Sequence, residues 1–474
     1  MKRSRTFGDR VVPADPDDLV SFSVVYQGKP GTTLDDVRSR LSLRTLDEFW
    51  PPDRVGVRAQ VVDQLRSLGF EVFKGSSPVV SARGSVRLFE SVFGGKLIKQ
   101  TRRRTTGISG RTRTVTSIVL STEFGPPSPD RIAGALHVAV AAVEPIPTTP
   151  SLPPVTRGFN LHLPGDIAQL TGASATHRLS TPLGERATGG GVGVAVIDQG
   201  IAEHPYYSGH GYRITRVAAA DVTSNPAHDD DAHGTCILSG LLACAPDVQV
   251  FGIKYGDPVV ALEGAIDTPG VKVISLSWGY DLSGKKTLAT AEFDHLPLQL
   301  VILDIIQKGV TVVAAAGNVG AINFPAMMPE VIAVGGVEVD AADSLSAYSG
   351  GSSFVSAIFK GRAVPDVCGI ASAALLPIPG TTPDPGPPKV SASPPGWDSL
   401  PGGTSLATCQ VAGVAALLLQ KSPTLTPLAV RAALMSTATD VVSGKTASGN
   451  RAKKGPDLAT GFGLVDALKA WNSV

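Results

Sequence analysis

Apolar positions in the first 145 residues change between a period of two and a helical spacing. Alternating side chains predict a strand over 19–26 (LVSFSVVY), and a short apolar run predicts a second strand over 70–73. Helical spacing predicts helices over 33–40, 54–68 and 85–93, two of which end at glycines. Strands and helices that alternate over so short a stretch favour a small α+β sandwich.

A different pattern begins near residue 158. Near-continuous runs of valine, isoleucine and alanine predict buried strands over 192–197, 271–277, 310–316 and 331–334. Apolar or amphipathic helices, such as the one predicted over 298–308, separate these runs. Buried strands that alternate with helices are typical of an α/β fold with a doubly wound, mostly parallel sheet covered on both faces.

Proline-rich stretches interrupt these patterns. The stretch 143–155 (VEPIPTTPSLPPV) predicts an exposed, extended linker, and 375–401 predicts an irregular loop because it is rich in proline and glycine. A chain of 474 residues is long enough for two or three domains. We therefore expect an N-terminal domain over 1–145, a linker over 146–157 and a second domain over 158–474.

Composition limits the class of protein. Hydrophobic residues make up 43% of the chain and charged residues 18%, which permits a large core and excludes overall disorder. A net charge of +1 argues against a nucleic-acid partner. No apolar run reaches the roughly 18 residues of a transmembrane helix, and no apolar stretch of signal-peptide length follows the basic start. We expect no transmembrane segment, and the compartment stays open between the cytoplasm and export by an unrecognised route.

Charge is distributed unevenly along the chain. Residues 1–150 hold 22 lysines and arginines against 15 acidic residues, a net charge of +7, whereas residues 151–474 carry −6. This asymmetry indicates either complementary surfaces on two domains or chance clustering in the basic run 99–113. We expect the stretch 99–104 (KQTRRR) to lie in a solvated or protease-sensitive loop.

Three short motifs combine residues that carry chemistry. VAVIDQG places Asp198 at the end of a predicted strand, DDDAHGTC places His233 at the start of a predicted helix, and GGTSLAT places Ser405 at the first turn of an apolar helix. A serine hydroxyl becomes a nucleophile when an imidazole takes its proton, and a carboxylate on the other ring nitrogen orients that imidazole. AAAGNVG adds Asn318, an amide donor for negative charge that develops on a carbonyl oxygen.

The order Asp, His, Ser along the chain is the order of subtilisin. The segment from about 158 to 474 resembles the subtilisin-like (subtilase) serine peptidases in the blocks VAVIDQGI, HGTC, SLSWG, AAGN and GTSLAT. The resemblance implies a serine endopeptidase that hydrolyses proteins or peptides through an acyl-enzyme and needs no cofactor for its chemistry. It also implies that Ser405 is the nucleophile, His233 the general base and acid, and Asp198 the orienting carboxylate.

Two further roles follow from the same resemblance. Asn318 corresponds to the oxyanion donor of the family. The backbone of a substrate is expected to add as a strand along SLSWG, which comprises Ser275, Leu276, Ser277, Trp278 and Gly279.

The N-terminal domain resembles the pro-kumamolisin type of activation domain, the prosegment of sedolisin-like peptidases. The likeness lies in LDEFWPP (46–52), VVDQLRSLGFEV (61–72) and GSVRLFESVFGGKL (84–97). It implies a ferredoxin-like prodomain that occupies the active-site cleft as an intramolecular inhibitor. The chain would then be a zymogen, with cleavage expected in the linker near 143–157.

Some positions depart from the subtilase pattern and leave alternatives open. Gln199 replaces the usual Ser or Thr, Cys409 the usual proline, and Trp278 is bulkier than the common leucine. The prosegment and VPDV (364–367) favour a sedolisin-like acid peptidase, whose catalytic pair is Glu and Asp, whereas HGTC and AAGN favour a histidine base and an amide donor. The other alternative is a catalytically silent pseudo-peptidase that binds peptides.

Metal and thiol chemistry are not indicated by the sequence. The acidic run 229–231 favours a solvated loop over a calcium site, because six or more oxygen ligands cannot be assembled from it; calcium remains possible without support. Four cysteines without a CxxC spacing predict neither a disulfide framework nor structural zinc. Cys236 and Cys409 are expected to be buried free thiols. Asp198 also suits a ribose-binding carboxylate, but glycines 189–191 precede its strand instead of following it.

Overall fold

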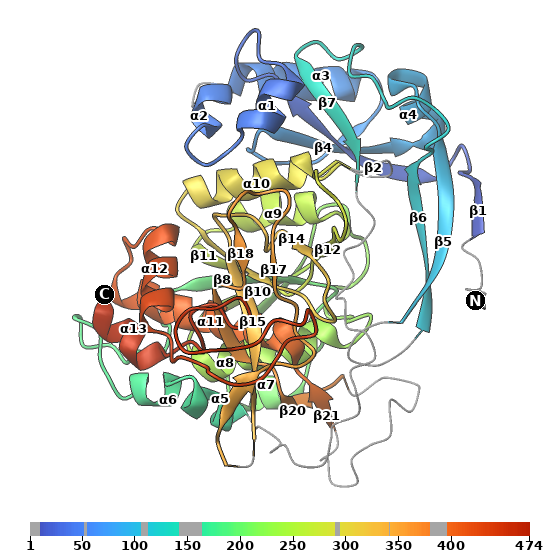
Figure 1. Cartoon of the computed structure of the whole chain (residues 1–474). Coiled ribbons are helices and arrows are strands. Elements are labelled where there is room, and N and C mark those ends of the chain that lie inside the picture. Colours follow the sequence, from blue (N-terminus) through green and yellow to red (C-terminus); the bar gives the residue numbers. More distant parts are fainter. Residues whose placement is uncertain are drawn as a thin grey trace.

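The computed structural model describes two packed segments of the chain (Figure 1). The described residues are 10–51, 55–105, 112–141, 164–289, 294–340, 342–379 and 396–474. We call residues 10–141 the N-terminal segment and residues 164–474 the C-terminal segment. The linker expected over 146–157 lies outside the described residues, so the expected domain boundaries stay predictions.

The N-terminal segment contains a four-stranded antiparallel sheet with the strand order β3-β4-β2-β7. Its strands are β2 (Leu19–Tyr26), β3 (Glu71–Val72), β4 (Val79–Ser85) and β7 (Ala135–Val140), and its helices are α1 (Leu34–Arg40), α2 (Leu46–Phe49), α3 (Val55–Ser67) and α4 (Val86–Phe93). The strand expected over 19–26 is confirmed. The three expected helices are confirmed to within one residue at each end, and the shorter strand within two.

Local capping and an aromatic core explain this sheet and its helices. The Ser85 hydroxyl accepts a hydrogen bond from a backbone N–H in the first turn of α4. Phe22 of β2 packs edge-on against Phe70, Phe89 and Phe93, with ring centroids 4.9, 5.2 and 5.3 Å away. Such edge-to-face pairs fix the position of the helix on the sheet more firmly than aliphatic contacts of equal area.

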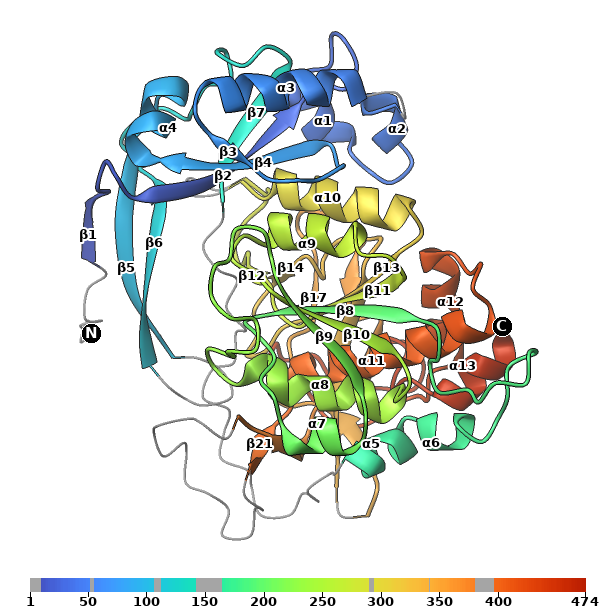
Figure 2. The same cartoon turned by 180° about the vertical axis from the view of Figure 1, so that it is seen from behind.

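A separate three-stranded ribbon leaves the N-terminal sheet. Its strands are β1 (Arg10–Pro13), β5 (Leu97–Thr105) and β6 (Thr112–Leu120), paired antiparallel in the order β1-β5-β6. Figure 2 shows β5 and β6 running from the N-terminal segment along one side of the C-terminal segment. The expectation of a loop over 99–104 is therefore wrong, because these residues pair in register with a threonine- and valine-rich partner strand.

The C-terminal segment is built on an eight-stranded sheet. The order is β16-β15-β13-β11-β8-β10-β9, with β19 pairing β15, and all pairs are parallel except β15 with β16. The strands are β8 (Gly193–Asp198), β9 (Arg213–Ala218), β10 (Gln249–Lys254), β11 (Val271–Leu276), β13 (Thr311–Ala315), β15 (Ile332–Val339), β16 (Leu345–Ala347) and β19 (Val367–Ile370). The four expected buried strands and the mostly parallel, doubly wound α/β class are confirmed.

Helices cover both faces of this sheet. One face carries α9 (Pro258–Ile266) and α10 (Leu296–Gln307), and the other carries α8 (His233–Cys244) and α11 (Gly403–Lys421). The shorter helices are α5 (Pro164–Leu170), α6 (Ala173–Thr176), α7 (Pro205–Gly209), α12 (Pro427–Thr437) and α13 (Ala467–Ser473). Among the described residues, α11 is long and apolar enough to cross a membrane, yet 94% of its most apolar stretch is buried in the protein, as in a core helix.

The stretch 375–401 is not irregular throughout. Its ends belong to β20 (Ala373–Pro377) and β21 (Trp397–Pro401), which pair antiparallel. The expectation of a loop is wrong at both ends, because this pairing joins positions 20 to 28 residues apart that no local pattern reveals. Four further short strands are β12 (Tyr280–Asp281), β14 (Asn323–Phe324), β17 (Phe354–Val355) and β18 (Ala363–Val364).

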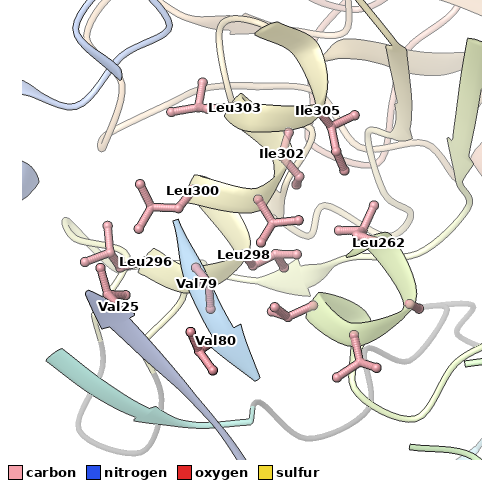
Figure 3. Packing of buried hydrophobic residues seen from close by; sticks show 14 of the residues in the cluster. Val25, Val79, Val80, Leu262, Leu296, Leu298, Leu300, Ile302, Leu303 and Ile305 are labelled. Atoms are coloured by element: carbon pink, nitrogen blue, oxygen red, sulfur yellow. The ribbon is translucent and has the colours of Figure 1, made fainter. Parts of the chain in front are cut away.

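The N-terminal sheet packs on the C-terminal segment through α9 and α10. Figure 3 shows Val25 of β2 next to Leu296 of α10, and Val79 of β4 next to Leu298 of α10. Val80 of β4 and Leu262 of α9 belong to the same cluster. These residues belong to one hydrophobic cluster that runs from the N-terminal sheet into the C-terminal segment. Burial of this apolar surface is the main force that holds the two segments together.

Polar side chains complete the contact between the segments. Glu263 of α9 is fully buried and accepts a hydrogen bond of 2.7 Å from the Ser77 hydroxyl. Asp294 pairs with Arg38 and lies 3.0 Å from the His137 ring nitrogen Nε2. The C-terminal segment thus contributes carboxylates to this contact, and the N-terminal segment contributes hydroxyl and basic groups.

Candidate active site

The expected aspartate lies at the carboxyl edge of the central strand. Asp198 ends β8, which lies between β10 and β11, and the residue is 1% exposed. In the parallel register, Ser275 of β11 pairs with Val196 of β8, so Ser277 lies beside Asp198. Sites of doubly wound folds form at this edge of the sheet, where loops meet after the strands.

The expected histidine is joined to this aspartate. His233 is the first residue of α8, and its Nδ1 lies 3.0 and 2.9 Å from the two carboxylate oxygens of Asp198. An ionised carboxylate only accepts, so Nδ1 carries the hydrogen and the neutral ring keeps its lone pair on Nε2. Glycine follows His233 because a Cβ on Gly234 would lie 2.1 Å from the Gly200 carbonyl oxygen.

The expected serine lies in the first turn of α11. Ser405 is 3% exposed, and its hydroxyl donates to the Ser277 carbonyl at 3.0 Å. The Ser277 hydroxyl donates back to the Ser405 carbonyl at 3.0 Å, so these two residues tie the start of α11 to the strand next to Asp198. Within the described part of the chain, the buried Nε2 of His233 has no hydrogen-bond partner, and the Ser405 hydroxyl is directed to Ser277 instead.

Asn318 follows β13 at the same edge of the sheet. Its side-chain oxygen accepts from the backbone N–H of Thr404 at 3.2 Å and from the Thr404 hydroxyl at 3.3 Å. Because these bonds fix which end of the amide is the oxygen, they orient its N–H groups relative to Ser405. Gly403 allows this approach, since a Cβ there would lie 3.3 Å from the Asn318 oxygen and its φ is +60°.

The SLSWG stretch reaches the site as the end of β11. Ser275 and Leu276 are fully buried in β11, and Ser277 to Gly279 lie between β11 and β12. Trp278 is 1% exposed, and its indole N–H donates to the Ile197 carbonyl at 2.8 Å. The side chain of Trp278 therefore fills the interior next to Asp198 and is bonded to the end of β8.

The acidic run before α8 is part of the site at two of its three positions, so the expectation of a solvated loop holds only for Asp230, which is exposed. Asp231 is 4% exposed and accepts from the backbone N–H of His233 at 3.0 Å. Asp229 accepts from the Thr235 backbone N–H at 2.7 Å and from the Thr235 hydroxyl at 2.6 Å. Both carboxylates cap the first turn of α8, whose N-terminal amides have no partners within the helix.

Charge around His233 favours its protonated form. Burial lowers the pKa of His233, but the charge and hydrogen bond of Asp198, with the charges of Asp231 and Asp229, outweigh burial and raise that pKa to about 9. Burial and the charges of Asp231 and Asp198 raise the pKa of Asp229 to about 8. The proton-accepting form of His233 therefore predominates in the alkaline range.

Cysteines and other carboxylates near the site have structural partners. The four cysteines are buried free thiols, which confirms the expectation for Cys236 and Cys409. Cys409 lies 3.6 Å from the hydroxyls of Ser275 and Ser277, and burial raises its thiol pKa to about 12, so it stays protonated and unreactive. Asp366 of the VPDV stretch is 3% exposed and is paired with two arginines.

Metal binding finds no support in the part of the chain that the structure describes. No group of three or more histidine, cysteine, aspartate or glutamate side chains there is arranged to hold a metal ion.

The subtilase family model matches residues 189–463, more than half of the chain. The chain belongs to the subtilase family. The matched range includes Asp198, His233, Asn318 and Ser405. The expectation of a subtilisin-like serine endopeptidase is confirmed at the level of the family, whose chemistry needs no cofactor. The match does not extend to the N-terminal segment.

Known relatives agree with this assignment. Subtilisin from Bacillus pumilus is 29% identical over 272 residues, which cover 53% of this chain and 85% of that protein. Subtilisin E from Bacillus subtilis (strain 168) is 30% identical over 279 residues, which cover 53% of this chain and 61% of that protein.

A solved structure shows the same fold. Fervidolysin from Fervidobacterium pennivorans, described as a keratinolytic enzyme related to subtilisin, matches with a TM-score of 0.57 and 18% identity. The match covers 96% of this chain and therefore includes the N-terminal segment, but it spans only 61% of the fervidolysin chain. At this identity the likeness shows the fold alone.

Proposed function

We propose that the chain is a serine endopeptidase made as a zymogen, in which Ser405, His233 and Asp198 hydrolyse peptide bonds of proteins or peptides. The observation that carries the proposal is the hydrogen bond between Asp198 and His233 Nδ1 at the edge of the sheet where the first turn of α11 holds Ser405. In the subtilase fold, these three residue types at this edge suit acyl transfer.

The chemistry begins with a rotation of the Ser405 side chain from the Ser277 carbonyl toward His233. Nε2 of neutral His233 takes the hydroxyl proton while Ser405 Oγ attacks the carbonyl carbon of the scissile bond. The resulting imidazolium is stabilised by Asp198 and then gives its proton to the departing amine as the C–N bond breaks. A water molecule that loses a proton to His233 then attacks the acyl-enzyme. The bond to Ser405 Oγ breaks, Ser405 Oγ takes the proton back from His233, and the acid product leaves.

Two groups would hold the substrate during these steps. The Asn318 amide would donate to the oxygen that becomes negative in the tetrahedral intermediate, because its own oxygen is already engaged by Thr404. The backbone at Ser277–Gly279, which lies between β11 and β12, would pair with an extended substrate segment.

The proposed prodomain is residues 1–145, followed by a linker over 146–157 and the peptidase domain over 158–474. The β-α-β-β-α-β order of the N-terminal sheet supports a ferredoxin-like fold of the pro-kumamolisin type. Ala141, which follows β7, lines a small cavity together with Tyr280, the residue after Gly279. The end of β7 therefore lies near the residue that follows the proposed substrate strand, and this proximity supports inhibition by the prodomain.

The test is labelling of the purified full chain with a serine-directed fluorophosphonate, followed by intact-mass analysis. We expect one covalent label on the parent, none on Ser405→Ala, and loss of the N-terminal mass in the parent alone. A Ser405→Ala chain that is processed as well as the parent would instead support a peptide-binding pseudo-peptidase cleaved by another enzyme.

A pH profile separates the proposal from a sedolisin-like acid peptidase. A histidine base predicts activity that rises from acid toward alkaline pH, whereas a carboxyl pair predicts an optimum in acid. The pairing of Asp366 with Arg362 and Arg431 also removes this carboxylate from acid–base chemistry, because the arginines outweigh burial and lower its pKa.

A further inference from the structure

The loop before α8 brings two carboxylates to the base of the proposed triad. The N-cap position of α8 is Ala232, which has no side-chain oxygen and a left-handed φ of +67°. The capping oxygens come instead from Asp231, bonded to the His233 N–H, and from Asp229, bonded to the Thr235 N–H. The backbone N–H of His233 is thus bonded to one carboxylate, and that of Thr235 in the same turn to the other.

His233 is the first residue of α8, so the charges near the start of this helix affect the stability of its imidazolium. The N-terminal end of a helix carries positive partial charge, which disfavours an imidazolium at its first residue. Besides Asp198 from β8, the carboxylates of Asp231 and, above its pKa of about 8, of Asp229 oppose this effect from the loop, and both residues have buried oxygen atoms. The electric field at the ring is therefore set by three acids and one helix terminus.

The other ionisable groups packed around this turn do not cancel the negative charge. Tyr207 from α7 donates to the Thr235 carbonyl, and burial raises the pKa of its phenol well above the ordinary value. Cys409 from α11 is likewise neutral, since burial raises its pKa to about 12. Lys254 from β10 is directed to Asp230, 3.1 Å away, and to the His228 carbonyl.

We propose that Asp229 and Asp231 are positioning residues of His233, which fix its backbone and stabilise the imidazolium that forms when Ser405 loses its proton. They thereby place the working range of the enzyme at alkaline pH. This inference rests on the proposed roles of His233 and Ser405. If the two acids acted only as helix caps, they would fix the position of the imidazole without changing the pKa of His233. Capping and stabilisation of the imidazolium can therefore be separated by titration.

The experiment measures kcat/KM of the mature enzyme against pH with a short chromogenic peptide. Asp229→Asn and Asp231→Asn keep a side-chain oxygen for the capping bond and remove the charge. We expect each to move the ascending limb to lower pH by about 0.5–1 unit, while the alkaline plateau falls by less than about threefold. Asp230→Asn, which changes the neighbouring carboxylate that pairs with Lys254, should move the limb less than either.

A second measurement does not depend on activity. The imidazole of His233 is titrated by NMR in the full-length Ser405→Ala chain, alone and combined with Asp229→Asn, Asp231→Asn or Asp231→Ser, since serine also caps helices without charge. A downward shift of the midpoint in these variants would show that the two acids stabilise the imidazolium of His233, independently of whether the chain is active. NMR midpoints of His233 equal to that of the parent would show that the two acids are caps only. A pH profile of kcat/KM with a lowered plateau and an unchanged ascending limb would show the same.

Discussion

At the scale of single residues, the amide of Asn318 acts through its orientation. Thr404 binds the side-chain oxygen twice, so the N–H end is left to face the reacting carbonyl in the proposed mechanism. We predict that Asn318→Ala lowers kcat by about 100- to 1,000-fold, or about 3 kcal/mol, with little change in KM. This scale is borrowed from the loss of one oxyanion donor in subtilisin itself. Steady-state kinetics on a peptide amide provides the measurement.

Thr404→Val is the matched control for this prediction. Valine has nearly the shape of threonine, and it removes the hydroxyl bond to Asn318 while the backbone N–H bond remains. We expect a loss of kcat of about tenfold or less, because one of two orienting bonds persists. An Asn318→Ala enzyme with a kcat near that of the parent would contradict the assignment of the oxyanion donor.

Residues with a distinctive local sequence could be predicted, and residues placed by distant backbone could not. Asp198, His233 and Ser405 each lie in a short motif next to a predicted strand or helix end. The Ser405 hydroxyl, however, is directed to a carbonyl 128 positions away in the sequence, so its direction depends on how α11 meets β11. The hydrogen bonds of Asp229 and Asp231 to the start of α8 were missed because an acidic run alone is typical of a solvated loop; its place directly before HGTC was the available signal.

At the scale of the element, α8 can hold His233 only if the helix approaches β8 closely. Gly234 permits this approach, since a Cβ there would lie 2.1 Å from the Gly200 carbonyl and 3.1 Å from the Asp198 Cβ. We predict that Gly234→Ala lowers the stability of the fold by about 2 kcal/mol or more and lowers activity further by displacing His233 from Asp198. Thermal unfolding in the Ser405→Ala background, where self-digestion is prevented, measures the first effect.

Gly264→Ala in α9 is the control at the same scale. No atom lies within 4 Å of a Cβ at this helical position, so alanine adds helix propensity without a clash. We expect equal or higher stability, by about 0.5–1 kcal/mol, and unchanged activity. If Gly234→Ala unfolds at the same temperature as Gly264→Ala, the close approach of α8 to β8 is not what requires glycine.

Elements with a strong local pattern were predictable, and those defined by pairing partners were not. The buried strands of the C-terminal sheet and the helices over 33–40 and 85–93 follow from apolar spacing and capping residues. The ribbon strand over 97–105 was missed because arginines and threonines without apolar alternation do not indicate burial. The pair β20 and β21 was missed because proline-rich sequence separates the two strands.

At the scale of the whole molecule, opposite charges meet where the two segments pack. The contact brings Arg38 and His137 of the N-terminal segment to Asp294, and these partners together with the Leu296 N–H outweigh burial and hold the Asp294 pKa below its ordinary value. We predict that docking of the N-terminal segment weakens as salt rises from 0.05 to about 0.5 M, because partly exposed ion pairs are screened. Inhibition of the processed enzyme across a salt series is the measurement, and a flat response would show that exposed ion pairs do not contribute to docking.

The buried Glu263 makes the same contact dependent on pH. Burial raises its pKa from an ordinary 4.5 to about 7, although the hydrogen bond from Ser77 opposes the shift. The docked state therefore binds the proton more tightly than a state in which Glu263 meets water. Docking is strongest below about pH 4.5, weakens as pH rises toward about 7, and levels off above it. Between these limits we predict a loss on the order of 3 kcal/mol in docking free energy.

Hydrogen exchange of the β2 and β4 amides in the full-length Ser405→Ala chain reports this loss, after correction for the intrinsic dependence of exchange on pH. Glu263→Gln keeps an acceptor for Ser77 and removes the titration, so its protection factors should change less between pH 5 and 8 than those of the parent. Burial and the charge of Asp221 also raise the pKa of Asp257 to about 7. Asp257 therefore accounts for the pH dependence that persists in the variant. Equal pH dependence in parent and variant would assign the whole effect to groups other than Glu263. A weaker dependence in the variant would mean that rising pH loosens the N-terminal segment between about pH 4.5 and 7, before His233 loses its proton near its pKa of about 9.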